Sequence, residues 1–190
     1  MSEDDFLGFL HTRNNLLDGV CISGGEPLLQ EGLEGFIDKV KELGFLVKLD
    51  TNGSDPEKLR KLIESGKIDY VAMDIKNSPE KYATTIGVPG YDIAPVEESV
   101  DILCSGTIPY EFRTTVVKEF HTADDLLSIA HWISEADKQQ SYNEQKYFLQ
   151  KFTDSENVKQ KGLHGHTDEE MRRLLNYVNT VLPSAELRGV

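Results

Sequence analysis

Cysteine is scarce in this sequence: only Cys21 and Cys104 occur among its 190 residues. Two thiols are too few for a disulfide framework or for a zinc site with four thiolate ligands. Each cysteine lies in an apolar stretch, so we expect both to be buried side chains that pack as small apolar groups. We expect a cytoplasmic protein, because thiols stay unpaired in that reducing compartment.

Long apolar runs and an excess of basic residues are also missing. No run approaches the ~20 apolar residues that a membrane-spanning helix needs, and the acidic start MSEDDFLGFL lacks the layout of a signal peptide. With 20 basic and 33 acidic side chains, the formal net charge is −13. A general binder of phosphate backbones needs a basic face. The sequence therefore predicts no membrane and no nucleic-acid partner, and its length predicts one domain over residues 1–190.

What the sequence does contain is an alternation of short apolar runs and amphipathic stretches. The apolar runs predict five buried strands, at residues 20–22, 45–49, 70–73, 112–117 and 147–149. The amphipathic stretches predict helices at residues 2–13, 28–43, 96–104, 122–134 and 167–181, and one that begins at Pro56 after the capping residue Asp55. Residues 185–190 are expected to be only a short terminal piece.

This alternation predicts a parallel sheet with right-handed crossover connections. A doubly wound open sheet and a complete or partial (β/α) barrel both fit the pattern. In either fold, ligands bind beyond the carboxyl ends of the strands. We therefore look for functional residues directly after each predicted strand.

The first predicted strand is followed by Ser23, Gly24, Gly25, Glu26 and Pro27. The two glycines allow a ligand to approach the backbone closely. Glu26 adds a carboxylate, and Pro27 fixes the direction in which the chain enters the next helix. A tight turn would explain a pair of glycines alone, but the complete four-residue string GGEP is more specific.

The next two predicted strands also end in polar side chains. Asp50, Thr51 and Asn52 follow the second strand, where a simple turn is the alternative interpretation. Asp74 and Lys76 follow the third strand, and residues two apart in an extended chain share a face. A simple ion pair is the alternative for these two residues.

Polar residues occur in the last two predicted strands as well. Arg113 lies within an apolar run, and a buried arginine needs a carboxylate or anion partner. Gln150 follows the fifth run. The acidic side chains at these strand ends could hold an amine or a hard cation, and the basic ones could hold a carboxylate. The combination suits a zwitterion, or an amino acid joined to a nucleoside.

The order of these strings resembles that of a known family. LLDGVCISGGEPLLQ is followed by VKLDTNG, YVAMDIKNSPEKY, EFRTTVV, YFLQKF and ELRGV. The sequence resembles the radical S-adenosylmethionine (SAM) superfamily, and within it the activating proteins of glycyl-radical enzymes. The resemblance is greatest to the activating protein of anaerobic ribonucleoside-triphosphate reductase, in the form related to pyruvate formate-lyase activase. It implies an α/β fold, a partial TIM-like (β/α)₆ barrel.

The resemblance also implies SAM as a cofactor. Gly24, Gly25, Glu26 and Pro27 match the motif whose backbone receives the amino group of the SAM methionine. Asp50 and Thr51, with Asp74, match positions that line a monovalent cation beside the SAM carboxylate. Asn52 and Lys76 lie in the same matched stretches, Arg113 matches a basic residue that faces SAM, and Gln150 matches a position near the adenine.

The sequence departs from this family in one respect. The family has a CxxxCxxC loop after its first strand, and its three thiolates hold a [4Fe–4S] cluster that leaves one iron open for SAM. This sequence has no such motif. We therefore expect an N-terminally truncated member that lacks the first strand and the cluster loop, retains part of the SAM site and has no catalytic residue of its own.

In the complete enzyme, the resemblance implies a 5′-deoxyadenosyl radical that abstracts hydrogen from a glycine of a partner reductase or lyase, with electrons from a separate donor. Two alternatives remain open. The chain could be a degenerate, non-catalytic barrel that binds SAM, a nucleoside or a protein. It could also be an unrelated (β/α) enzyme, such as an aldolase-like barrel that uses Lys76.

Overall fold

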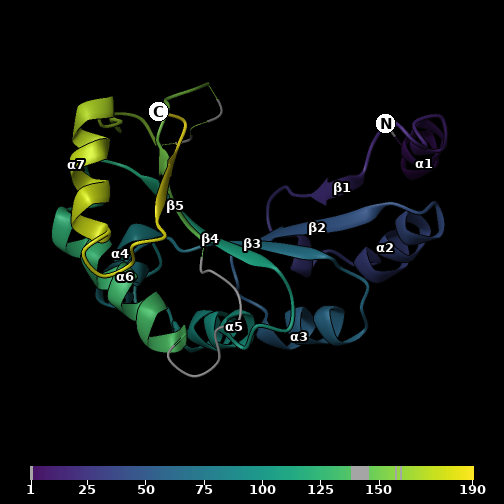
Figure 1. Cartoon of the computed structure of the whole chain (residues 1–190), viewed down its shortest axis with the longest axis horizontal. Coiled ribbons are helices and arrows are strands. Elements are labelled where there is room, and N and C mark those ends of the chain that lie inside the picture. The colour runs from purple at the N-terminus through teal and green to yellow at the C-terminus, as the bar shows by residue number, and fades with distance from the viewer. Residues whose placement is uncertain (1, 138–145, 157, 159) are drawn as a thin grey trace.

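The computed structural model describes residues 2–137, 146–156, 158 and 160–190. Six strands form one sheet in which each strand pairs in parallel with the next strand of the sequence (Figure 1). This arrangement confirms the predicted partial barrel. The strands are β1 (Gly19–Ile22), β2 (Leu46–Thr51), β3 (Tyr70–Asp74), β4 (Tyr110–Val116), β5 (Tyr147–Lys151) and β6 (Glu186–Arg188).

The sheet curves into an open crescent with helices along its outer side (Figure 1). The first helix lies at the β1 end of the crescent, and the last helix packs near β5 and β6. The helices are α1 (Glu3–His11), α2 (Leu33–Glu42), α3 (Pro56–Glu64), α4 (Tyr82–Thr85), α5 (Ala94–Cys104), α6 (Ala123–Asp137) and α7 (Asp168–Val178), with short 3₁₀ helices η1 (Pro27–Leu29) and η2 (Pro79–Lys81).

Side chains divide between the two faces of the sheet with the period of two that a strand imposes. In β2, Val47 and Leu49 are fully buried toward the helices, whereas Lys48 and Asp50 are only partly buried. In β4, Phe112 is fully buried and Arg113, next in the chain, is partly exposed. The apolar core therefore lies between sheet and helices, and the concave face carries polar side chains.

The structure corrects the predicted helix over residues 28–43. A 3₁₀ turn, η1, comes first, and α2 begins only at Leu33. Gly32 has a φ of 78°, a left-handed conformation that interrupts the helix. Leu29, which the periodicity placed on the inward stripe, is 66% exposed. The Lys58 ammonium donates to the Leu28 carbonyl oxygen and so holds the separate turn in place.

The structure also adds a strand that the sequence pattern did not reveal. Residues 186–188, expected to be part of a short terminal piece, form β6 and pair with β5. A strand of three residues is too short to show a clear alternation of apolar and polar side chains. It also pairs with a strand that lies far from it in the sequence. The predicted N-cap of α3, Asp55, is confirmed by its side-chain hydrogen bond, and Thr167 caps α7 in the same way. Among the described residues, no helix has the length and apolarity to span a bilayer.

The backbones of β1 and β2 meet closely at Gly19, and this contact yields a stability prediction. A Cβ added at Gly19 would lie 2.5 Å from the carbonyl oxygen of Leu46. A backbone atom in a paired strand cannot move aside without loss of pairing. We expect Gly19→Ala to lower the unfolding free energy in urea by about 1–3 kcal/mol. Gly35→Ala in α2, where the added Cβ meets no atom within 4 Å, is the control and should not destabilise the protein. Equal stability of both variants would contradict the close approach.

Candidate functional site

The GGEP loop joins β1 to η1 and presents open backbone at the carboxyl end of the sheet. A Cβ on Gly24 or Gly25 would meet no heavy atom within 4 Å. The two glycines line a cavity of about 390 Å³ that extends to Glu3 and Phe36, and a second cavity of about 160 Å³. A ligand can therefore reach the backbone of this loop from either cavity.

The Glu26 side chain ties this loop to the end of β2. Its carboxylate is buried and accepts hydrogen bonds from the Leu28 amide at 3.1 Å, the Thr51 hydroxyl at 2.7 Å and the Asn52 amide at 2.6 Å. The Thr51 hydroxyl in turn accepts from the Gly53 amide at 3.1 Å. Glu26 and Thr51 thus hold two strand-end loops in a fixed relation.

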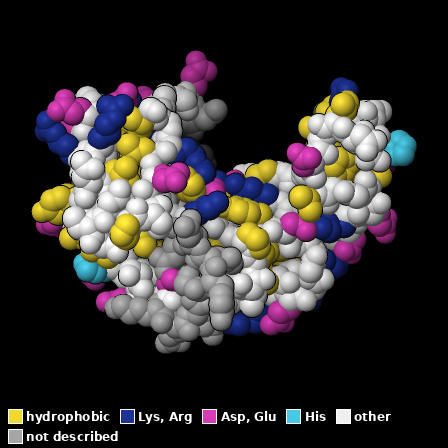
Figure 2. Space-filling model, viewed as in Figure 1, with side chains coloured by type: hydrophobic (Ala, Val, Ile, Leu, Met, Phe, Trp, Pro, Cys, Tyr) yellow, Lys and Arg dark blue, Asp and Glu magenta, His cyan; other side chains and the backbone are white. Residues whose placement is uncertain are grey.

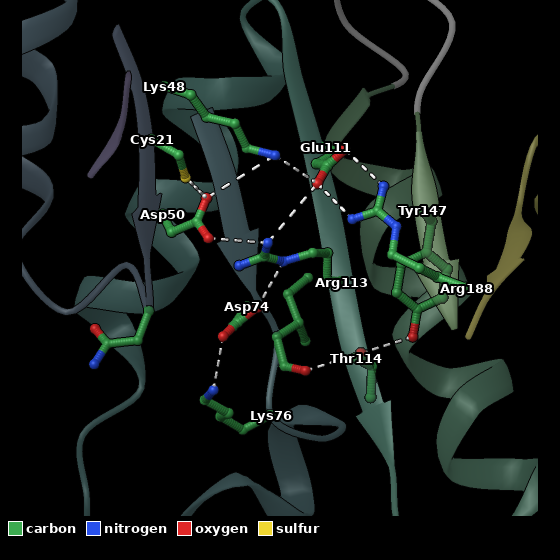
Figure 3. Close-up of polar contacts among 12 residues, drawn as sticks. Cys21, Lys48, Asp50, Asp74, Lys76, Glu111, Arg113, Thr114, Tyr147 and Arg188 are labelled. Carbon is green, nitrogen blue, oxygen red and sulfur yellow. Dashed lines mark hydrogen bonds and ion pairs between the residues drawn. The ribbon is translucent and has the colours of Figure 1, made fainter. Parts of the chain in front are cut away.

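A second group of predicted residues meets on the concave face (Figure 3). Arg113 donates from Nη1 to Asp50 at 3.1 Å and from Nε to Asp74 at 2.9 Å, which confirms that this arginine has carboxylate partners. Lys76 pairs with Asp74 at 3.0 Å. Burial lowers the pKa of Arg113, but the charges of Asp74 and Asp50 outweigh this effect and hold that pKa above its ordinary value.

The structure brings most of the predicted site residues to one place. Two of them lie outside the smaller cavity, of about 160 Å³. Gln150 lies in β5, in register with Thr115 and Arg188, and Pro27 lines the larger cavity, of about 390 Å³. The smaller cavity is lined by Ser23, Gly24, Gly25, Glu26, Asp50, Thr51, Asn52, Asp74, Lys76 and Arg113.

The sequence interpretation missed a second carboxylate cluster beside these residues. Glu111 is 4% exposed, and its oxygens accept from Lys48 at 3.2 Å, from the Tyr70 hydroxyl at 3.2 Å and from Arg188 at 2.9 and 3.1 Å. The alternation of side chains between the two faces of a strand could have predicted part of this cluster. Lys48 stands two residues before Asp50, and Glu111 stands two before Arg113, so each pair shares a face.

The surroundings of Glu111 favour its charged form. Burial raises the pKa of Glu111, but the hydrogen bonds and charges of Arg188 and Lys48 outweigh it and lower that pKa to about 2. Burial, together with the negative charge of Glu111, raises the pKa of Tyr70 to about 12, so its phenol remains a hydrogen-bond donor. In Figure 2 the concave face is a hollow whose floor carries Lys and Arg side chains among acidic and apolar ones.

Comparison with known proteins identifies the family. Residues 3–133 match the model of the radical SAM superfamily. The chain belongs to the radical SAM superfamily. It is 36% identical over 124 residues to a Methanocaldococcus jannaschii protein that bears the name glycyl-radical enzyme activating enzyme, with 63% of this chain and 52% of that protein covered. It is 27% identical over 116 residues to a Thermococcus kodakarensis protein that bears the name GTP 3′,8-cyclase, with 58% and 36% covered. The chain thus spans about half or less of the length of these curated relatives.

Two solved structures share the fold of this chain. The structure of Streptococcus suis SuiB superposes on this radical SAM chain with a TM-score of 0.75 at 13% identity, covering 100% of this chain and 44% of SuiB. A spore photoproduct lyase variant superposes with a TM-score of 0.65 at 12% identity, covering 98% and 66%. At these identities the similarity concerns the partial barrel alone.

The family implies a [4Fe–4S] cluster, and the cysteines of this radical SAM chain do not fit one. Cys104 is 2% exposed, and burial raises its pKa to about 12. The expectation that Cys21 is buried is wrong. Its strand is a sheet edge, and its thiol is exposed, 3.5 Å from an Asp50 oxygen. Among the described residues, no group of three or more His, Cys, Asp or Glu side chains could hold a metal ion. Two separate thiols cannot replace the three thiolates that such a cluster takes.

The pKa of Glu111 predicts how stability depends on pH. Its carboxylate titrates near pH 2 in the folded chain, against an ordinary value of 4.5. Its ion pairs therefore stabilise the fold fully above pH 4.5, and this contribution is lost as the pH falls from 4.5 toward 2. We expect urea unfolding of the wild type to lose roughly 2–4 kcal/mol from this group across that range.

Glu111→Gln should be less stable than the wild type at pH 7, and this part of the pH dependence should be absent from it. Glu98→Gln, which removes an exposed partner of Arg60, is the control and should follow the wild-type profile. A Glu111→Gln profile parallel to the wild type between pH 4.5 and 2 would show that Glu111 does not titrate in this way.

Proposed function

We propose that this chain binds SAM in the cavity between the GGEP loop and the charged residues of β2, β3 and β4. The open backbone of Gly24 and Gly25, beside that charged group in a radical SAM fold, is the observation that carries the proposal. The cavity offers acidic groups for the ammonium and sulfonium of SAM and basic groups for its carboxylate. We also propose that residues 1–190 form one domain of a cytoplasmic protein.

Each residue has a proposed part in binding. The backbone of Gly24 and Gly25 receives the methionine amino group, and the chain turns at Pro27 into η1. The Glu26 side chain fixes this loop against Thr51 and the Asn52 amide. The loop backbone is therefore preorganised for a ligand, which reduces the entropy lost on binding.

The charged residues orient the methionine carboxylate. Lys76 is partly exposed at the cavity and offers an ammonium to that carboxylate, and Asp50 and Asp74 balance Arg113 below it. We propose Asp50 and Asp74, with Thr51, as the contacts of a monovalent cation, and Gln150 as the residue on the adenine side. When bound, SAM would supply the sulfonium carbon–sulfur bond that this superfamily cleaves reductively. The residues of this chain contribute binding and orientation to that reaction.

The same geometry argues against the aldolase-like alternative. A lysine nucleophile is activated by a desolvated pocket or by another cation nearby. Lys76 instead pairs with the Asp74 carboxylate, and 42% of its side chain is exposed. The desolvated pocket that activates a lysine nucleophile is therefore not found around Lys76.

Gly25→Val tests SAM binding without altering the core. The added side chain begins in open space at the cavity and should exclude the methionine end of the ligand. Isothermal titration with SAM should give an affinity at least about tenfold weaker than that of the wild type, a loss of about 1.4 kcal/mol. Gly35→Val in α2, where an added Cβ also meets no atom within 4 Å and where the residue lines neither cavity, should bind as the wild type does. Equal SAM affinity in both variants, or none in the wild type, would refute the site.

We further propose that the partner is a glycyl-radical enzyme, a reductase or a lyase, with a separate electron donor. The name of the M. jannaschii relative supports this choice. The non-catalytic binding barrel remains the second candidate, because the two cysteines of this chain do not fit a cluster.

Disruption of the gene in its own organism separates these two candidates. Under anaerobic growth, cells that lack the gene should lose the glycyl-radical signal in electron paramagnetic resonance spectra of the reductase or lyase. The wild-type gene and the Gly35→Val gene should restore the signal, whereas Gly25→Val should not. A signal that persists without the gene would reject the activating role in favour of the binding barrel.

A further inference from the structure

Arg188 belongs to the C-terminal string ELRGV, which the proposed function leaves unused. From β6 it extends over the ring of Phe148 in β5, with its guanidinium carbon 3.9 Å from the ring centroid. Beyond that ring it donates two hydrogen bonds to Glu111 of β4, at 2.9 and 3.1 Å (Figure 3). The last strand thus reaches across its neighbour to a carboxylate in the middle of the concave face.

Glu111 requires several donors, because a buried carboxylate is costly unless it is paired and hydrogen-bonded. Its side chain is 6% exposed. Lys48 and Tyr70 each donate one hydrogen bond, and Arg188 donates the other two of the four that the described residues supply. Arg188 therefore contributes half of the hydrogen bonds that satisfy Glu111.

Arg113 lies between Glu111 and the SAM cavity and has three carboxylates within reach. Its contacts are 3.1 Å to Asp50, 2.9 Å to Asp74 and 3.9 Å to Glu111. The first two are hydrogen bonds, and the third is longer than a hydrogen bond. Because other donors occupy both oxygens of Glu111, the guanidinium turns toward the two aspartates. Lys48 already contacts Glu111, so with Arg188 absent the second guanidinium within reach of that carboxylate is Arg113.

We propose that Arg188 is a positioning residue: by saturating Glu111, it keeps Arg113 on Asp50 and Asp74. Arg113 then neutralises the carboxylates that line the cavity, and its placement sets the charge that a ligand meets there. The effect of Arg188 on the position of Arg113 does not depend on the proposed function. Only the consequence for ligand affinity rests on it.

Nitrogen-15 spectra of the arginine Nε–H groups test this placement without any ligand. The Arg113 Nε–H donates to Asp74, so its signal should be shifted and slow to exchange with water; Arg113→Lys assigns it. In Arg188→Met, which retains the apolar stem but no donor, the signal should move and exchange faster. Arg188→Lys should largely preserve it. Arg173→Gln, which removes an exposed ion pair with Glu169, is the control and should leave it unchanged.

The double variant Glu111→Gln/Arg188→Met distinguishes positioning from general stabilisation. With the competing carboxylate neutralised, the Arg113 signal should stay as in the wild type even without Arg188. This variant also decides the question if Arg188→Met does not fold, because it removes the buried charge that Arg188 compensates. An unchanged signal in folded Arg188→Met, or a displaced one in the double variant, would overturn the proposal.

The affinity for SAM tests the consequence for the ligand. We expect Arg188→Met to bind SAM about tenfold more weakly and Arg188→Lys to stay within about threefold of the wild type. A displaced Arg113 signal with unchanged affinity would overturn the claim about ligand charge. A wild type that does not bind SAM would reject the proposed function, and the Nε–H comparison would still decide the placement of Arg113.

Discussion

The buried carboxylate of Glu111 is the contact on which the concave face of this sheet depends. It lies on β4 and accepts from residues of β2, β3 and β6, so one side chain links four of the six strands. Removal of one partner of a buried ion strongly destabilises a fold, because the remaining charge is left without compensation. The requirement to satisfy Glu111 therefore constrains the side chains around it. Arg113 is one of them, and its place beside the cavity follows from that constraint.

The cavity itself follows from two simpler rules. Strand side chains alternate, so Val47 and Leu49 build the core while Asp50 faces the hollow. Parallel strands end at one edge, so the loops after β1, β2 and β3 meet there. The Glu26 carboxylate then fixes the glycine loop against β2. The result is exposed glycine backbone on one side of the cavity and, on the other, acidic and basic side chains that form ion pairs with one another.

These rules explain how much could be predicted from the sequence. Five strands, the parallel order and the meeting of Asp50, Asp74, Lys76 and Arg113 all depend on local periodicity and on the shared strand edge. The string GGEP suggested its loop, and the order of this and the later strings suggested the family. Each of these signals lies within a few residues of chain, and for that reason it can be read without a structure.

Most of the features that were missed depend on contacts between distant parts of the chain, and the break at Gly32 depends on one local backbone angle. Arg188 and Glu111 are 77 residues apart, and β6 is a strand only because β5 lies beside it. Cys21 is exposed because β1 is a sheet edge, although its apolar neighbours favour burial. The left-handed Gly32 divides a stretch whose apolar spacing indicated one continuous helix.

Chemical-shift mapping of backbone amides during titration with SAM tests the central claim most directly. If SAM binds as proposed, the largest shifts should fall at residues 23–26 and 50–52, at Asp74 and Lys76 and at Arg113, which line the cavity of about 160 Å³. A different cavity, of about 540 Å³, lies between the N-terminal ends of α3 and α5 and serves as an internal comparison. Shifts concentrated at residues 54–60 and 92–98, or no shifts at saturating SAM, would contradict the account.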